Sequence, residues 1–190
     1  ARDNNYQIVI VIAGTTTNLV HQSFNRLHKD LNVNEGIHRK WVILKNPTIQ
    51  KSPQDKNTIK KEVDLWRDSK TPDYLKKTVL ITVMKQKDHL FNLLNILKKI
   101  DMDGVPTLII DDEGDQASMN TKASVNAKNK LEGSLSEEQV STIYDRIRKL
   151  KSAIPHHTFL QYTATPQAPL FINLMDNLSP NFIQLLTPGD

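Results

Sequence analysis

The sequence predicts an α/β fold, a three-layer arrangement in which helices cover both faces of a parallel β-sheet. Strand-like and helix-like runs alternate along the 190 residues, which is typical of successive β-α-β units. The run from Tyr6 to Ala13 is uniformly apolar, which indicates a strand covered on both faces. A second apolar run, from Val105 to Ile110, ends in a cluster of carboxylates. We therefore expect a buried sheet with polar groups concentrated at strand ends.

In the first half of the chain, the strand at 6–13 is followed by Gly14 and three threonines that can cap a helix. The apolar positions of that helix recur at helical spacing, at Val20, Phe24, Leu27 and Leu31. Residues 41–44 form a second predicted strand. Residues 46–58 contain two prolines and many polar groups, so we expect a loop there, followed by a short helix with Ile59, Val63 and Trp66 on its apolar side.

In the second half, residues 80–84 and 105–111 are predicted strands, and the helix between them ends by Asp101. Its apolar stripe is Leu90, Leu93, Leu94, Leu97 and Ile100. The polar segment 116–134 has too few apolar residues to pack, so we expect a mobile loop. Ser136 and Gln139 form a capping box for a helix that continues to Leu150, and 158–162 is the last strand. Residues 1–190 are expected to form one domain.

Composition limits the class of protein. The chain has no cysteine, so disulfides and thiolate metal sites are excluded, and we expect a cytoplasmic protein. No apolar run approaches the roughly 20 residues of a membrane span, so no membrane partner is expected. The net charge of +4 permits a polyanionic partner but does not require one.

The carboxylates that follow the strand at 105–110 are the most informative feature. Asp111, Asp112, Glu113 and Asp115 lie within five residues and repel one another, which favours a bound cation such as hydrated Mg2+. An apolar strand followed by Asp-Glu is the pattern of a Walker B element, in which the Asp holds Mg2+ and the Glu positions the attacking water. The alternative is an acidic turn that simply closes a solvated strand.

Two further strand ends carry unusual polar sequences, and together the three segments resemble motifs Ia, II and III of superfamily 2 helicases. The segments are Ala13 to Asn18, Ile110 to Ser118, and Tyr162 to Ala168, with the cores AGTTTN, DDEGDQAS and TATPQA. More narrowly, they resemble the Z-one domain, which is described as an endonuclease domain and is found in bacterial helicase-like proteins. The resemblance extends from about residue 8 to the end of the chain. It implies a RecA-like, P-loop NTPase-type sheet.

The resemblance also implies residue roles. Asp112 would hold the water shell of Mg2+, and Glu113 would orient the water that attacks the terminal phosphate of ATP. Asp115 would form a hydrogen bond to Thr163 or Thr165 and so link nucleotide state to the last strand. The turn formed by Gly14, Thr15, Thr16 and Thr17 would contact the nucleic-acid backbone, consistent with the anion affinity of a helix N-terminus. Lys85, after the strand at 80–84, is a further candidate for that contact, with a solvated lysine as the alternative.

One element of the family pattern is missing. A P-loop ends in Gly-Lys-Ser or Gly-Lys-Thr, and none of the six glycines here is followed by lysine. We therefore expect a fragment of the first RecA-like lobe that lacks the P-loop strand. An upstream P-loop segment and a second RecA-like lobe would come from the same parent chain. Mg2+ and ATP are expected for that parent, whereas this chain alone should bind neither tightly and should be inactive.

Three functions remain open on the sequence. The first is a helicase-like ATPase lobe of a bacterial DNA-processing or restriction-like defence protein, with DNA as the partner. The second is a non-catalytic nucleic-acid or protein interaction module in which the acids have lost their role. The third is a metal-dependent endonuclease, which ranks last because no glutamate is followed two positions later by lysine, as in the Glu-x-Lys motif of many nucleases.

Overall fold

The computed structural model describes residues 1–31, 40–50, 52–113, 142–164, 178, 181–184 and 186. These residues form an α/β fold around a five-stranded, all-parallel sheet with strand order β2-β3-β1-β4-β5. The predicted α/β class with a parallel sheet is confirmed. The strands are β1 (Ile8–Ala13), β2 (Trp41–Lys45), β3 (Thr78–Met84), β4 (Thr107–Asp112) and β5 (His157–Tyr162).

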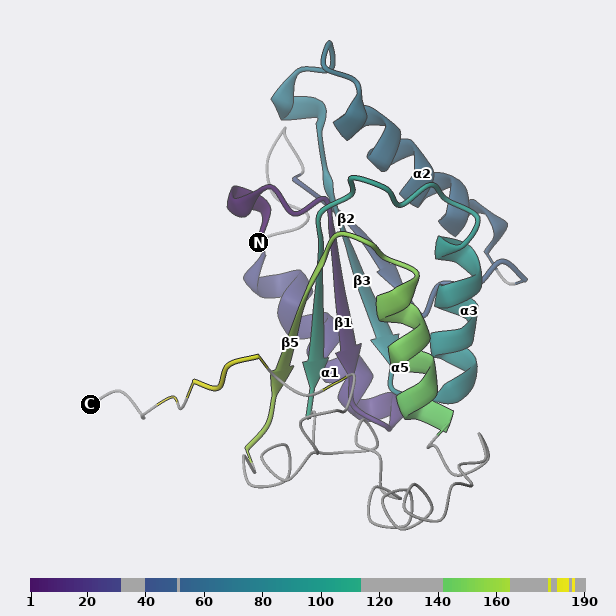
Figure 1. The fold of residues 1–190 in the computed structure, drawn as a ribbon, viewed down its shortest axis with the longest axis vertical. Coiled ribbons are helices and arrows are strands. Elements are labelled where there is room, and N and C mark those ends of the chain that lie inside the picture. Colours follow the sequence, from purple (N-terminus) through teal and green to yellow (C-terminus); the bar gives the residue numbers. More distant parts are fainter. Residues whose placement is uncertain are drawn as a thin grey trace, which may run out of the picture.

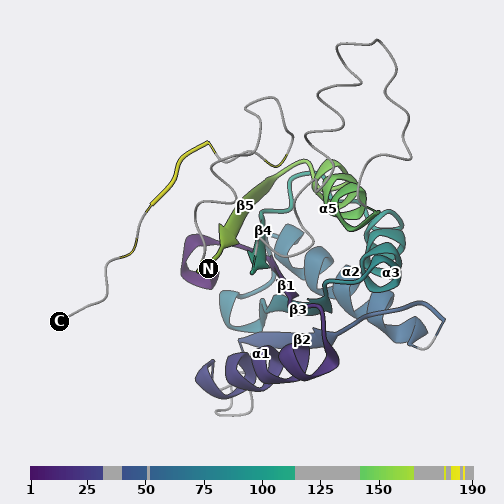
Figure 2. The same ribbon diagram turned by 90° about the horizontal axis from the view of Figure 1, so that it is seen from below.

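The helices lie on both faces of the sheet, as Figures 1 and 2 show. Helix α1 (Thr17–Asp30) covers one face, and the other face is covered by α2 (Pro53–Arg67), α3 (Lys87–Leu97) and α5 (Thr142–Ser152). Two short 3-10 helices, η1 (Arg2–Asn4) and η2 (Asp73–Leu75), complete the described elements. No helix within the described ranges has the length and apolarity that crossing a membrane requires.

Strand β1 lies at the centre, and all six of its residues are buried. Its even-numbered isoleucines, such as Ile10, belong to the apolar cluster under α2, α3 and α5. Val9 and Val11 belong to the smaller cluster that includes Leu27 and Leu31 of the α1 side. Both faces of β1 are therefore packed, which explains why its sequence is uniformly apolar instead of alternating.

Because all five strands are parallel, their carboxyl ends meet along one edge of the sheet, at the lower side of Figure 1. The register places Ile12 beside Asp111 and Asp112 beside Tyr162. The ends of β1, β4 and β5 are consequently neighbours. The polar segments that follow these three strands in the sequence begin next to one another.

Helix α2 begins earlier than expected. It starts at Pro53, within the segment predicted to be a loop, and continues to Arg67. Proline fits the first turn of a helix because that position needs no intrahelical N–H donor. Asp55 stabilises this start: its carboxylate accepts hydrogen bonds from the Ser52 hydroxyl at 2.7 Å and the Thr48 backbone N–H at 3.3 Å. The predicted capping box at Ser136 and the predicted loop 116–134 lie outside the described residues.

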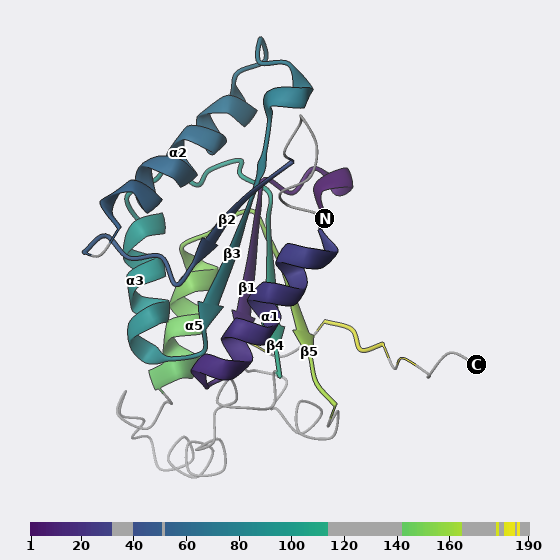
Figure 3. The same ribbon diagram turned by 180° about the vertical axis from the view of Figure 1, so that it is seen from behind.

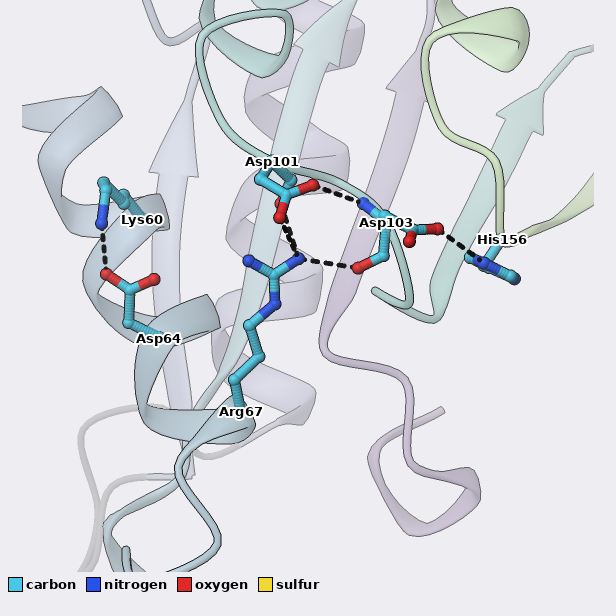
Figure 4. Close-up of polar contacts among 6 residues, drawn as sticks. All are labelled: Lys60, Asp64, Arg67, Asp101, Asp103 and His156. Carbon is cyan, nitrogen blue, oxygen red and sulfur yellow. Dashed lines mark hydrogen bonds and ion pairs between the residues drawn. The ribbon is translucent and has the colours of Figure 1, made fainter.

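The opposite edge of the sheet, where the strands begin, is joined by polar contacts at the protein surface (Figure 4). The Arg67 guanidinium donates to the carbonyls of Asp101 and Asp103 at 3.1 and 2.7 Å and forms an ion pair with the Asp101 carboxylate. Asp103 contacts the His156 imidazole at 3.2 Å. The end of α2 and the segments before β4 and β5 are thereby connected. Because these charged groups are largely exposed, each pair adds little stability.

The buried Glu62 carboxyl provides a test of how α2 packs. Burial raises the pKa of the Glu62 carboxyl, and the positive charges of Lys77 and Lys61 only partly oppose this. The folded state therefore binds the proton more tightly than the unfolded state, and the free energy of unfolding should fall as pH rises from about 4.5 through the raised pKa. We expect Glu62→Gln to remove this slope and to be at least as stable as the parent at neutral pH.

Urea unfolding at a series of pH values measures the effect. Asp64→Asn is the matched control, because Asp64 lies on the same helix with its side chain 49% exposed and should leave the slope in place. Identical pH slopes in the parent and in Glu62→Gln would contradict the assignment.

Candidate functional site

The candidate site lies at the carboxyl edge of the sheet. Asp112 ends β4, Glu113 follows it in a turn, and Thr163 directly follows β5. The turn from Gly14 to Thr17 joins β1 to α1 at the same edge. The structure therefore brings together the described parts of all three polar segments. Two predicted site residues, Asp115 and Thr165, lie outside the described residues.

The consecutive acids of β4 point to opposite sides of the sheet. Asp111 lies on the same side as Ile109, which packs under α3 and α5, and it is 0% exposed. Asp112 lies on the side of Ile110, which packs toward α1, and it is half-buried. A fully buried carboxylate requires a compensating partner, whereas Asp112 remains accessible to a ligand.

The partner of Asp111 is Lys85, whose position differs from the prediction. Its side chain is fully buried, and its ammonium forms an ion pair with Asp111 Oδ1 at 2.8 Å. The ammonium also donates to the backbone carbonyls of Asp112 and Glu113, at 2.5 and 2.8 Å. Lys85 therefore cannot contact a nucleic-acid backbone in this conformation, and it is not a solvated lysine. Both earlier interpretations of Lys85 are replaced by an internal role.

This pair also changes the electrostatic interpretation of the acids. Because Lys85 neutralises Asp111 inside the protein, Asp111 does not contribute to the mutual repulsion that favours a bound cation. Asp112 and Glu113 remain as the described acids available to a ligand. The described ranges contain no group of three metal-ligating side chains. A divalent ion here would be held by Asp112 through a single carboxylate and by water, a ligand set that suits Mg2+.

Glu113 has an unusual backbone conformation. Its φ angle of +53° lies in the left-handed region, which is unfavourable for residues other than glycine, asparagine and aspartate. Its Oε2 atom is buried and has no hydrogen-bond partner within the described structure. A buried carboxylate oxygen without a protein partner is suited to hold a water molecule.

The β1–α1 turn leads into the N-terminus of α1. Gly14 is buried, whereas Thr16 and Thr17 are exposed. The Thr16 hydroxyl caps α1 by accepting the Leu19 N–H at 3.4 Å. The first turn of the helix contains no acidic residue, so its partial positive charge is not offset. The predicted role of Gly14, Thr15, Thr16 and Thr17 in binding a phosphate stays a prediction.

Two residues of this edge were missed by sequence reasoning. Asp111 was grouped with the other acids, and Gln161 was not considered, although its Nε2 donates to Asp111 Oδ2 at 3.3 Å. The signal that could have revealed the buried positions of Asp111 and Lys85 was the alternation of side chains along the strands. Counting in steps of two from the buried Ile109 and Val83 places Asp111 and Lys85 at inward positions on the same face. Opposite charges at two inward positions indicate a buried ion pair.

No protein-family model, no curated protein and no solved structure matches this chain. The class that the structure shows is the parallel α/β fold.

Gly14 provides the first test of this edge. A Cβ atom at position 14 would lie 2.7 Å from both Cβ and Cδ1 of Leu19, so Gly14→Ala must displace the first turn of α1. We expect a loss of about 1–3 kcal/mol in unfolding free energy and faster amide exchange in that turn. Gly104→Ala is the control, since a Cβ there meets no atom within 4 Å but the φ of +66° is strained. Gly104→Ala should lower the free energy of unfolding without altering amide exchange in α1. Unchanged amide exchange in Gly14→Ala would contradict the packing argument.

The buried pair provides the second test. Lys85→Met keeps the apolar stem of the side chain but leaves the Asp111 carboxylate buried without its counter-charge. We expect a loss of about 3–5 kcal/mol in urea unfolding, with most of it recovered in Lys85→Met/Asp111→Leu. Lys60→Met, which removes an exposed ion pair with Asp64, should cost less than about 1 kcal/mol. Equal losses in Lys85→Met and Lys60→Met would contradict a buried ion pair.

Proposed function

We propose that this chain is a helicase-like ATPase lobe of a bacterial DNA-processing or defence protein, related to superfamily 2 helicases and the Z-one domain. In this proposal Asp112 holds hydrated Mg2+, and Glu113 orients the water that attacks the terminal phosphate of ATP. The observation that carries the proposal is the adjacency of β4 and β5, where Asp112 is in register with Tyr162, the residue before Thr163. Motifs II and III require that adjacency, and the sequence alone did not guarantee it.

The sheet also supports the proposed partner segments. Within the described residues, β5 pairs with β4 along one side and is the last strand of the sheet. A further parallel strand could pair along its other side. We propose that an upstream segment of the same parent chain supplies that strand and the P-loop, which would then lie beside Thr163 and Glu113. A second RecA-like lobe of the parent would complete the nucleotide site.

DNA is the proposed macromolecular partner, held at the β1–α1 turn. The exposed Thr16 and Thr17, together with the N–H groups that begin α1, provide neutral donors for a phosphate. The turn follows β1, which is hydrogen-bonded to β4. A DNA contact there would lie one strand away from the acids. This neighbourhood gives a physical route by which DNA binding could influence hydrolysis.

A non-catalytic interaction module is the alternative, and one observation favours it. Since Asp111 is neutralised internally by Lys85, the acidic segment can persist for structural reasons without any metal. An endonuclease ranks below both, because no glutamate is followed two positions later by lysine. In either alternative, Asp112 and Glu113 would have no role in nucleotide hydrolysis.

The decisive experiment measures Mg2+-dependent ATP hydrolysis by the longest natural polypeptide that contains this chain. Glu113→Gln should lower kcat by roughly 10²–10⁴-fold, because the carboxylate that positions the water is lost. Nucleotide affinity should stay within about threefold, since Glu113 acts in the transition state and not in binding. Asp103→Asn is the control, because Asp103 precedes the same strand at the opposite edge of the sheet. Unaltered turnover in Glu113→Gln, or no ATPase activity in the parent, would favour the interaction module.

A further inference from the structure

Lys85 connects the ends of three strands. Its backbone N–H donates to the carbonyls of Ala13 and Gly14, at 2.9 and 3.3 Å, at the end of β1. Its side chain passes beyond that strand to β4, where the ammonium contacts Asp111 and two backbone carbonyls. Lys85 itself directly follows β3. Lys85 thus connects the ends of β3, β1 and β4 at the carboxyl edge. Figure 3 shows these three strands side by side.

The two carbonyls that accept from the ammonium belong to Asp112 and Glu113. These are the residues at which β4 ends and the backbone turns into the left-handed region, with φ +53° at Glu113. Such a conformation persists in a non-glycine residue only when surrounding contacts enforce it. Hydrogen bonds from a charged donor are stronger than neutral ones. The ammonium therefore holds both carbonyls that flank the strained φ of Glu113.

The ammonium is itself fixed in place. Asp111 provides its counter-charge at 2.8 Å, and Gln161 of β5 donates to the other oxygen of the same carboxylate. Lys85 and Asp111 are both fully buried, so the pair does not exchange its contacts with water. The series Lys85, Asp111 and Gln161 extends from β3 to β5 on the α3 and α5 side of the sheet.

We propose that Lys85 is a positioning residue that holds the backbone of Asp112 and Glu113, and thereby directs the Glu113 carboxylate. This inference concerns the geometry of the turn, and its catalytic consequence rests on the proposed function. Asp111 holds the ammonium in place, and Gln161 connects this arrangement to the strand that precedes Thr163. Lys85 touches neither nucleotide nor water in this role.

The test uses Lys85→Met/Asp111→Asn. This double variant removes both charges together. The amide oxygen that the second substitution introduces can still accept from Gln161, so the contact between β4 and β5 is kept while the ammonium and its carbonyl contacts are lost. Lys45→Met is the matched control, because Lys45 ends the neighbouring strand β2 at the same edge and contacts His21 at the surface. Backbone 13Cα and 13Cβ chemical shifts of Glu113 report its φ angle. Steady-state kinetics of the natural polypeptide separate kcat from KM for ATP.

We expect Glu113 to leave the left-handed region in the double variant and to keep it in Lys45→Met. Where the parent hydrolyses ATP, kcat should fall about tenfold or more in the double variant with KM nearly unchanged, as for the loss of a transition-state interaction. Unchanged Glu113 shifts in a folded double variant would overturn the inference, and so would unchanged kcat. If the parent shows no ATPase activity, the proposed function fails, while the chemical shifts still decide whether Lys85 sets the turn.

Discussion

The carboxyl edge of the sheet depends on one buried charge pair, Lys85 with Asp111. Removing both charges from water costs several kcal/mol per ion, and the cost is offset only by close contact and by hydrogen bonds that occupy the remaining donors and acceptors. Here the ammonium has three oxygen atoms within 2.8 Å, and the other oxygen of the Asp111 carboxylate accepts from Gln161. Because these partners come from different strands, the pair can form only when β3, β4 and β5 are in register. It therefore specifies the alignment of the strand ends more than it adds to stability.

The two edges of the sheet are organised differently. At the amino edge, Arg67, Asp101, Asp103 and His156 form exposed contacts that solvent and salt weaken. At the carboxyl edge, the charges are buried and the backbone of Glu113 is strained. Strain and buried charge are features that functional sites tend to combine. The asymmetry is the reason to place the proposed site at the carboxyl edge.

The apolar pattern was sufficient to predict the fold class but not the details of the edge. The uniformly apolar sequence of β1 and the apolar stripe of α3 each reflect burial directly. The fold class and the order of these elements could therefore be predicted from them. The start of α2 was missed because Pro53 was taken as a loop signal, although it also fits a first helical turn. Lys85 and Asp111 were misplaced because charge in a sequence suggests exposure, and only strand alternation shows that both point inward. Contacts between residues far apart in sequence, such as Gln161 with Asp111, are not visible in any local pattern.

Internal neutralisation of Asp111 has a consequence for whatever binds at this edge. If every acid of the segment were free, the edge would attract cations strongly and would resist the approach of a polyphosphate or a DNA strand. Pairing Asp111 with Lys85 removes one negative charge without closing the site, since Asp112 stays half-buried and accessible. The start of α1, whose first turn has no acidic residue, adds partial positive charge at the same edge. An accessible aspartate beside uncharged donors suits a metal ion that arrives already bound to a phosphate. The proposed Mg2+-nucleotide ligand fits this electrostatic arrangement better than a free metal ion does.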